Sequence, residues 1–499
     1  MDVIRINRKD NVAVALKDLK TGENITLDDA PDTELKNDIL RGHKFALKDI
    51  KAGEDIIKYG NSIGKAVCDI KKGEWVHTHN VKTGLDYITD YTYEPTDICG
   101  GNDPVVKKAT FNGFVRENGE VGIRNEIWII PTTACVNDIV KRLARLGEAY
   151  KERFLANIDS VVAFTHPYGC SQTGEDKEAT EKILADLATH PNAAGVLIVG
   201  LGCENSPVEA VREKMTGYDT ARVRFMVCQD EADEIKRGEE LLKELIDYAS
   251  EDVREEVPVY RLTVGLKCGG SDGLSGITAN PLLGHVSDRL INLGASCILT
   301  EVPEMFGAEK LLMNRCKDEK LFLRLVDMIN GFKRYFKDNG QNIYENPSPG
   351  NKKGGITTLE DKSLGCTQKS GTAQVSGILD YGGCVSDPGL NLLYAPGNDP
   401  VACTALAAAH AQIILFTTGR GTPFAAPVPT MKISSNNDLA ERKRNWIDFN
   451  AGTLVNGKYI DELTDELFKK IMDCANGEKV CAENSGYHDM AIFKRGVTL

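Results

Sequence analysis

The chain has 499 residues and a formal net charge of −13, with a pI near 5.3. This length exceeds what one hydrophobic core normally supports, so two or three domains are expected. The acidic balance argues against general binding to nucleic acid or to an anionic membrane, because such binding needs an excess of Lys and Arg. The sequence contains neither a long apolar run nor a secretion signal, and we expect a cytoplasmic protein.

Fourteen cysteines are spread over nearly the whole chain, and no CxxC pair occurs. A large chain without a secretion signal favours reduced thiols over disulfides. A zinc knuckle or a thioredoxin-type motif is disfavoured, so any metal site must be assembled from distant segments.

Residues 1–95 predict a small β domain, because short apolar runs alternate with glycine turns. A repeated K-x-G-E turn, at 20–23, 51–54 and 71–74, predicts hairpins around a left-handed glycine. The segment WVHTHN at 75–80 predicts a strand. His77 and His79 would then project from one face, where they could grip an ion or an anionic group, or simply be solvated.

Residues 96–110 are rich in Gly, Asn, Asp and Pro and predict a linker. Residues 111–250 predict a middle α/β domain that starts with two strands joined by an E-N-G-E turn. Arg124 and Asn125 follow this turn; an arginine there can clamp a carboxylate or form an ordinary ion pair. Strands and helices then alternate as in a parallel, Rossmann-like sheet, without the G-x-G-x-x-G loop, and Ser206 is the expected N-cap of one helix.

Three short glycine-cysteine signatures follow strand-like runs: HPYGC at 166–170, GLGCEN at 200–205 and CGGSDGLSGITANP at 268–281. A parallel sheet presents reactive side chains where its strands end. Each signature alone is also consistent with a turn in which cysteine packs as a small apolar residue. The three together favour a shared site at one sheet edge.

Residues 251–499 predict a second, larger α/β domain with Rossmann-like alternation, after a charged joint at 251–258. The segment 347–372 is rich in glycine and lysine and predicts a functional loop, in which Lys352, Lys353, Lys362 and Lys369 supply positive charge. A strand at 413–418 is followed by glycine, with Arg420 at its tip. Local cations of this kind suit a small anionic substrate.

With these motifs in view, the chain resembles the altronate/galactarate dehydratase family. The resemblance rests on RGHKFAL, VHTHN, HPYGCSQTG, GLGCEN, CGGSDGLSGITANP, TEVPEMFGAE, ENPSPGNKKGGITTLEDKSLGCTQK, FTTGRGTP and the terminal AIFKRGVTL. It runs from the first strand to Leu499. The segment KSLGC, with Cys366, favours altronate over galactarate as the substrate.

The resemblance implies a multidomain protein: a small amino-terminal β-clip (SAF-like) domain followed by two α/β domains. It implies loss of water from D-altronate to give 2-dehydro-3-deoxy-D-gluconate, with ferrous iron as the metal and Mn²⁺ as a substitute. Another sugar acid such as galactarate is the alternative substrate. A non-catalytic sugar-acid binding protein is the alternative of another class, and a homodimer is a further expectation.

Removing a proton next to a carboxylate requires a base, an acid for the leaving hydroxyl and positive charge near the developing enediolate. The candidate proton-transfer groups are His43, His79, His166 and Lys362. The candidate substrate anchors are Arg124, Asn125, Lys352 and Arg420.

Two metal sites remain open from the sequence. His77 and His79, with His43 or a carboxylate, could bind a single Fe(II) ion. Alternatively Cys170, Cys203 and Cys268 could converge as thiolate ligands of iron or of an iron–sulfur cluster.

Overall fold

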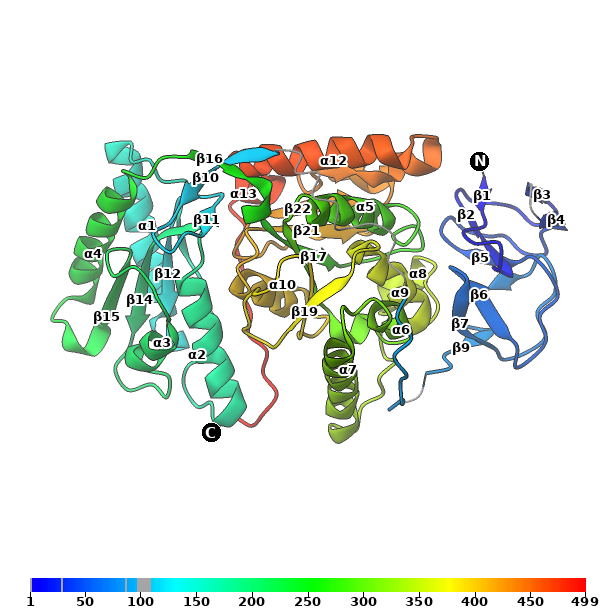
Figure 1. The fold of residues 1–499 in the computed structure, drawn as a ribbon, viewed down its shortest axis with the longest axis horizontal. Coiled ribbons are helices and arrows are strands. Elements are labelled where there is room, and N and C mark those ends of the chain that lie inside the picture. The colour runs from blue at the N-terminus through cyan, green and yellow to red at the C-terminus, as the bar shows by residue number, and fades with distance from the viewer. Residues whose placement is uncertain (1, 28–29, 86–87, 97–108) are drawn as a thin grey trace.

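The computed structural model describes residues 2–27, 30–85, 88–96 and 109–499. Three domains lie in a row, with the carboxyl-terminal domain between the amino-terminal and middle domains (Figure 1). Most of the predicted linker, residues 97–108, lies outside the described residues. Within the described ranges, no helix is both long and apolar enough to cross a membrane.

The amino-terminal domain contains β-strands and no α-helix in its described residues, as predicted. Its strands are β1 (Val3–Ile4), β2 (Val12–Ala15), β3 (Asn24–Leu27), β4 (Ala30–Glu34), β5 (Lys44–Ala46), β6 (Asp55–Lys58), β7 (Asn61–Ala66), β8 (Trp75–Val76) and β9 (Val81–Lys82). They form the small antiparallel sheets β1-β2-β5-β8, β6-β7-β9 and β3-β4.

The three K-x-G-E turns have one conformation, with φ of 84° at Gly22, 87° at Gly53 and 84° at Gly73. The glutamate side chain of each turn accepts a hydrogen bond from the backbone N–H of its lysine. The left-handed glycines are therefore confirmed. The hairpins are not, because each turn connects strands of two different sheets.

The middle domain is built on four parallel strands in the order β13-β12-β14-β15. Its elements are β10 (Thr110–Val115), β11 (Val121–Gly122), β12 (Glu126–Pro131), α1 (Asn137–Phe154), β13 (Val161–Ala163), α2 (Gly174–Ala188), β14 (Ala193–Gly200), α3 (Val208–Lys214), β15 (Val223–Val227) and α4 (Glu234–Ala249). Strands β10 and β11 form the predicted hairpin. The segment predicted as a charged joint contains β16 (Glu255–Pro258), which pairs with β10.

The carboxyl-terminal domain is built on seven parallel strands in the order β19-β20-β18-β17-β21-β22-β23. The strands are β17 (Thr263–Cys268), β18 (Ser296–Leu299), β19 (Val375–Leu379), β20 (Leu390–Leu393), β21 (Ile413–Thr418), β22 (Thr430–Ser434) and β23 (Phe449–Asn450). The helices are α5 (Ala279–Asn292), α6 (Glu309–Met313), α7 (Glu319–Asp338), α8 (Pro349–Lys353), α9 (Leu359–Cys366), α10 (Asp399–Ala408), α11 (Asn437–Arg442), α12 (Ile460–Ala475) and α13 (Cys481–Asn484).

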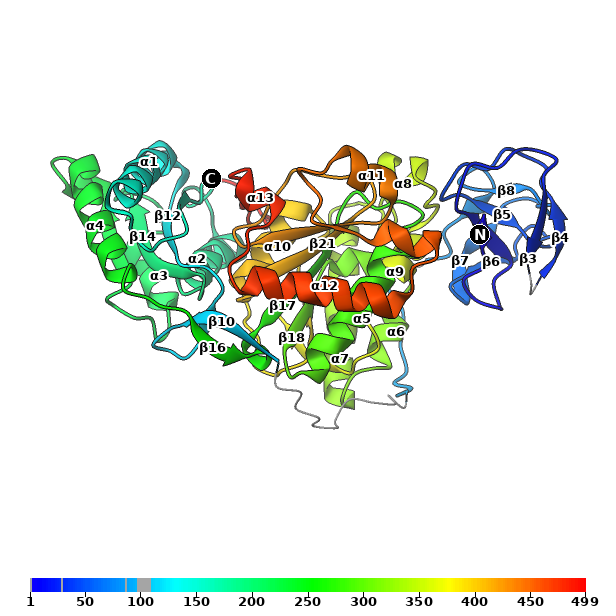
Figure 2. The ribbon, with the colours of Figure 1, turned by 90° about the horizontal axis from the view of Figure 1, so that it is seen from above.

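Apolar side chains bury both faces of this central sheet. One core joins it to α5, α7 and α12, and another joins its opposite face and α10 to α2 and the middle sheet. Seen from above, α12 lies along one side of the sheet (Figure 2). This packing leaves the carboxyl ends of the strands for the loops that carry polar side chains.

The prediction of a loop at 347–372 is wrong, because this segment contains the short helices α8 and α9. Ser348 caps α8 through a bond from Asn351 N, with Pro349 at the first position, and Thr358 caps α9 through Asp361 N. These local start signals outweigh the glycines.

Candidate active site at the carboxyl edge of the central sheet

Two neighbouring strands of the central sheet, β17 and β18, end side by side. Strand β17 ends in Lys267 and Cys268, and the chain after β18 continues through Glu301 to Glu304. All four side chains are buried. Since the strands are parallel, these groups meet at the same edge of the sheet, where ligands of α/β proteins usually bind.

Glu301 connects the end of β17 with the segment that contains Lys369. Its carboxylate pairs with Lys267 and accepts hydrogen bonds from Cys268 N at 3.2 Å and from Lys369 Nζ at 3.4 Å. Its backbone has a φ of 71°, in the left-handed region that non-glycine residues rarely adopt. Such strain persists where the surroundings enforce it, and it is commonest at functional sites.

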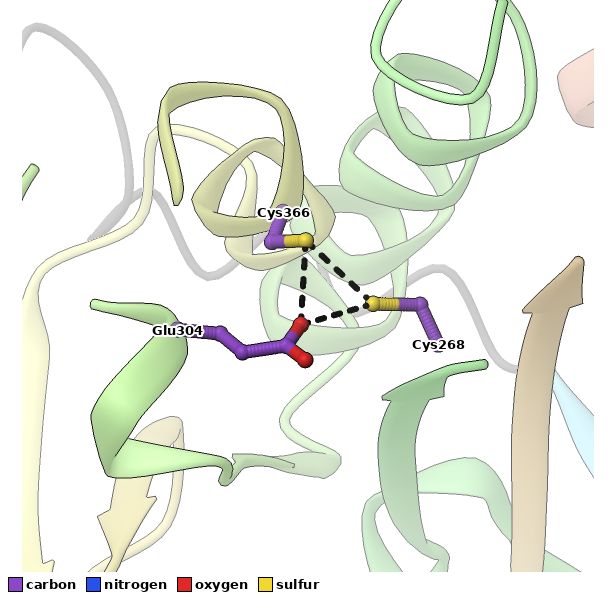
Figure 3. A group of neighbouring side chains, drawn as sticks. All are labelled: Cys268, Glu304 and Cys366. Atoms are coloured by element: carbon purple, nitrogen blue, oxygen red, sulfur yellow. Dashed lines mark hydrogen bonds between the residues drawn. The ribbon is translucent and has the colours of Figure 1, made fainter. Parts of the chain in front are cut away.

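Cys268, Glu304 and Cys366 form a compact group of potential metal ligands (Figure 3). The Cys268 Sγ lies 3.4 Å from the Cys366 Sγ, and Glu304 Oε2 lies 3.4 Å and 3.2 Å from these two sulfurs. All three residues are buried, and their ligand atoms lie within 4.8 Å of one another. Two thiols and one carboxylate suit a borderline divalent ion such as ferrous iron or zinc.

Two lysines lie against this group. Lys369 Nζ donates to Cys268 Sγ at 2.9 Å, and Lys362 Nζ pairs with Glu304 Oε1 at 2.8 Å. Lys362 also donates to Asn346 Oδ1 at 3.0 Å. Burial alone would lower the pKa of Lys362, but the Glu304 carboxylate outweighs burial and raises it. Lys362 is therefore an ammonium group, able to donate a proton or a hydrogen bond.

The two glutamates titrate differently. Burial raises the pKa of Glu301, and the neighbouring Glu304 charge adds to this effect. Burial would raise the pKa of Glu304 as well, but the ammonium groups of Lys362 and Lys267 outweigh it and hold the pKa well below its usual range. Paired carboxyl groups whose pKa values are pushed apart are typical of acid–base catalysis.

The amino-terminal domain docks on this edge through a buried charge cluster. Asp361 of α9 accepts from Lys44 Nζ at 2.8 Å and from Lys58 Nζ at 3.0 Å, and all three side chains are at most 2% exposed. The two lysines come from β5 and β6, so one carboxylate of the carboxyl-terminal domain holds two strands of the small domain. Burial, together with the Lys58 charge, lowers the pKa of Lys44 to about 8 despite this carboxylate.

Backbone contact brings the two domains still closer. A Cβ atom on Gly273 would lie 2.0 Å from the Gly42 carbonyl oxygen, so no larger residue fits at this position. Tyr59, which precedes β7, reaches a small cavity lined also by Lys362 and Cys366. Burial raises the pKa of the Tyr59 hydroxyl to about 12. The site is thus closed by both domains.

Three of the predicted histidines gather around Trp75. Its ring lies 5.7 Å from the ring of His43, 5.0 Å from His77 and 4.9 Å from His79. Residues 77–80 form a turn after β8, so the predicted strand is wrong there; His77 is buried whereas His79 is exposed. His77 and His79 therefore do not share a strand face.

The histidine nitrogens differ in their partners. His43 accepts from Trp75 Nε1 at 3.2 Å and donates through Nε2 to the Lys353 carbonyl at 3.2 Å, so it bridges the domains. His77 Nδ1 has no hydrogen-bond partner among the described residues. Burial, with the Lys44 charge, lowers the pKa of His77 to about 3, and the ring is neutral.

His166 lies in the middle domain, away from this cluster. Its Nε2 donates to the Pro131 carbonyl at 2.7 Å, and its Nδ1 accepts from Tyr168 N at 3.2 Å. Both nitrogens are engaged within one buried loop, which gives His166 a structural role in place of the predicted proton transfer.

The predicted meeting of Cys170, Cys203 and Cys268 is wrong. Cys170 and Cys203 are exposed and follow strands of the middle sheet, whereas Cys268 is buried at the end of β17 in the other sheet. Among the described residues, the compact group that contains Cys268 is completed by Glu304 and Cys366.

Two predicted substrate anchors, Arg124 and Asn125, make structural hydrogen bonds away from the candidate site. Arg124 is fully buried and makes a bidentate pair with Glu483 through Nε and Nη2, at 2.6 Å and 2.8 Å. Its Nη1 donates to two backbone carbonyls and Nη2 to a third. Asn125 is also buried and bonds to the carbonyls of Asn157 and Ala249. Arg124 therefore ties the middle domain to the carboxyl-terminal domain, Asn125 fixes the middle domain, and neither side chain has a donor left for a substrate.

The other two anchors lie near the site. Lys352 is half-buried on α8, next to Asn351, whose Oδ1 accepts from Lys362 at 3.4 Å. Arg420 is exposed in the loop after β21, where its backbone N–H bonds to the Gly270 carbonyl at 2.9 Å. Both cations lie beside the loops that close the carboxyl edge.

Several residues of the site were not foreseen from the sequence. They are Lys44, Lys58, Tyr59, Lys267, Glu301, Glu304, Asp361, and Cys366 as a ligand. A usable signal existed for two of them: Lys267 interrupts the apolar run VGLKC, and Lys58 interrupts IIKY. A lysine inside a buried strand is rare without a specific partner.

Three sequence models of one family cover nearly the whole chain. The altronate/galactarate dehydratase SAF domain matches residues 1–84, the D-galactarate dehydratase/altronate hydrolase second domain matches 113–250, and the D-galactarate/altronate dehydratase carboxyl-terminal domain matches 259–498. Together with the buried site of thiols and paired carboxylates and lysines, these matches define a dehydratase.

Full-length relatives agree. The chain is 50% identical over 505 residues to altronate dehydratase of Escherichia coli, covering 100% of both chains, and 50% identical over 498 residues to altronate dehydratase of Bacillus subtilis, covering 99% of both. Galactarate dehydratase (L-threo-forming) of E. coli is 33% identical over 98% of this chain and 96% of its own. The chain belongs to the D-galactarate/altronate dehydratase family, and the resemblance inferred from the motifs is confirmed.

Proposed function

We propose that the chain removes water from D-altronate to give 2-dehydro-3-deoxy-D-gluconate, with the chemistry at the carboxyl edge of the central sheet. The observation that carries this proposal is a buried group of two thiols and several paired carboxylates and lysines, closed by the amino-terminal domain. The 50% identity to two altronate dehydratases supports altronate as the substrate.

The residues suit the two proton transfers. Glu301, whose pKa is raised, is the proposed base for the proton at C2, because a weaker acid is a stronger proton acceptor. Lys362, held as an ammonium group by Glu304, is the proposed acid for the departing C3 hydroxyl. Lys352 and Arg420 at the rim are proposed to attract the substrate carboxylate.

We further propose that Cys268, Glu304 and Cys366 hold a ferrous ion, for which Mn²⁺ is the substitute. When bound, such an ion supplies a Lewis acid that stabilises negative charge on the substrate. The donor set supports this assignment more directly than the histidines do, since His79 is exposed on the turn beside Trp75.

Removal of these ligands tests the metal site. The variant with Cys268→Ser and Cys366→Ser is expected to lose about one iron per chain when iron is added without sulfide, because oxygen is a poorer ligand than thiolate for such ions. Iron is counted after gel filtration under anaerobic conditions. The exposed free thiol Cys384 provides the matched Cys→Ser control. Unchanged iron in the double variant would refute the assignment.

The activity is tested with a panel of sugar acids. The full chain is incubated anaerobically with Fe(II), reductant and altronate, galactarate or another aldonate, and 2-keto-3-deoxy acid is measured. We expect product from altronate at a kcat/KM at least about tenfold above the others, which corresponds to 1.4 kcal/mol. Preference for galactarate would favour the alternative substrate, and binding without product would favour a sugar-acid binding protein.

We also propose that both α/β domains are Rossmann-like. In the central sheet, β20-β18-β17-β21-β22-β23 follows the doubly wound order 3-2-1-4-5-6, with β19 added at one edge.

A reducing, cytoplasmic setting is supported by the free thiols of all thirteen cysteines in the described ranges. A homodimer stays a prediction.

A further inference from the structure

The middle sheet ends in cysteines of its own. After its four parallel strands come Cys135 following β12, Cys170 following β13, Cys203 following β14 and Cys228 following β15. Three of these thiols, on Cys135, Cys170 and Cys203, are exposed, and all four are free. The sheet thus presents three accessible thiols at the carboxyl edge, apart from the site on the central sheet.

Backbone hydrogen bonds bring the three cysteine loops together. Ala134 N donates to the Tyr168 carbonyl at 2.9 Å, and Ser206 N donates to the Gly169 carbonyl at 3.1 Å. Ser171 N donates to Asn205 Oδ1 at 2.8 Å. Each cysteine is therefore within a residue or two of a bond to a neighbouring loop.

Side-chain contacts and a strained backbone keep these loops in place. Thr132 Oγ1 donates to Glu204 Oε1 at 2.7 Å. Gly169 has a φ of 94°, and a Cβ there would lie 1.8 Å from the Thr132 carbonyl oxygen. Ser171 has a φ of 61°, which is unfavourable for serine. Strain of this kind is retained where a fixed geometry is needed.

The same loops contain buried polar atoms that lack hydrogen-bond partners among the described residues. They are Thr133 Oγ1, Gln172 Nε2 and Ser206 Oγ, in side chains that are 0%, 2% and 0% exposed. Ser206 was the predicted cap of α3, but Pro207 is the N-cap and the hydroxyl makes no cap bond. A buried polar atom left unpaired costs about 1–3 kcal/mol, so three in one place indicate a missing partner.

We propose that Cys135, Cys170 and Cys203 hold an iron–sulfur cluster at the carboxyl edge of the middle sheet. Three exposed thiols from three locked loops match the thiolate ligation of such clusters, and the unpaired hydroxyl and amide groups supply hydrogen bonds to its sulfides or to a bound anion. Three thiolates leave one iron open to an oxygen ligand.

The spacing favours a cluster over a single ion. The three sulfurs do not all lie within 4.8 Å of one another, unlike the Cys268 group. Thiolates of a cluster bind different iron atoms and therefore tolerate wider spacing. Cys228 is buried, and burial raises the pKa of its thiol to about 11, so it is the least suited of the four to act as a thiolate ligand.

The test reconstitutes the full chain anaerobically with ferrous iron, sulfide and reductant. We expect about three to four acid-labile sulfides per chain, with matching extra iron, together with the broad visible absorption of iron–sulfide bonds. The variant with Cys135→Ser, Cys170→Ser and Cys203→Ser should lose the sulfide and the absorption. The variant with Cys268→Ser and Cys366→Ser should keep both, and Cys68→Ser, which changes an exposed thiol of another domain, is the matched control.

The three single Cys→Ser variants, checked by circular dichroism, separate loss of ligand from loss of fold: each should lower the sulfide content with unchanged secondary structure. Wild-type protein that takes up no sulfide overturns the proposal. One zinc ion per chain in the wild-type protein that is absent from the triple variant would indicate a mononuclear site and would also overturn the proposal. Sulfide that the triple variant retains would overturn it as well. None of these results depends on dehydratase activity.

Discussion

Replacing Lys362 with methionine is expected to lower kcat for dehydration about 100- to 10,000-fold, the usual contribution of a well-placed general acid. The ammonium group lies 2.8 Å from Glu304 and next to Cys366, so its removal takes away the proposed donor to the leaving hydroxyl. The measurement is the steady-state rate with altronate at saturating substrate. Iron content is counted in the same samples, because Glu304 is also a proposed ligand.

Two further variants show whether Lys362 acts as a proton donor or only as a positive charge. Lys362→Arg keeps the positive charge but hardly releases a proton, so it should bind substrate and remain slow if Lys362 is an acid. Recovery of most of the rate by arginine would instead assign Lys362 to charge neutralisation. Lys310→Met, which removes an exposed lysine from nearby α6, is the matched control and should leave kcat within about twofold. A rate for Lys362→Met as high as this control would contradict the proposal.

The sequence predicted local features of the site well. The apolar runs that become β14, β17 and β21 end at or directly before the predicted glycines, since strand periodicity and turn residues are local signals. Lys362 and Cys268, chosen from their motifs, lie in the site that the structure assembles. The β-rich amino-terminal domain was likewise predictable from its regular turns.

The assembly of these features was not predictable, because local periodicity does not say which sheet a strand joins. Cys170 and Cys268 follow equivalent strand-glycine patterns but belong to different sheets. For the same reason Glu301, Glu304 and Asp361 could not be distinguished from the many charged surface residues. Their burial depends on contacts with segments tens to hundreds of residues away.

Replacing Asp361 with asparagine is expected to weaken docking of the amino-terminal domain by about 3–5 kcal/mol, because it leaves Lys44 and Lys58 as buried charges without a carboxylate. Hydrogen exchange of β5 and α9 should become faster, and the site should open to solvent. Asp438→Asn is the matched control, since that carboxylate pairs with Arg41 at the surface and should contribute about 1 kcal/mol or less.

The buried charge of Lys44 also makes docking of the amino-terminal domain depend on pH. The pKa of Lys44 is already lowered to about 8, below its usual 10.5, so the folded protein binds fewer protons than the unfolded chain between these values. Stability linked to Lys44 therefore rises as the pH increases from about 8 to 10.5. Without Asp361 the pKa of Lys44 falls further, because the attraction that opposed its deprotonation is gone. Raising the pH to 9, or adding Lys44→Met, should then restore part of the protection from exchange in Asp361→Asn. A loss that neither change relieves would mean that the aspartate acts through shape and hydrogen bonding to Thr357, and not through the two charges that it pairs.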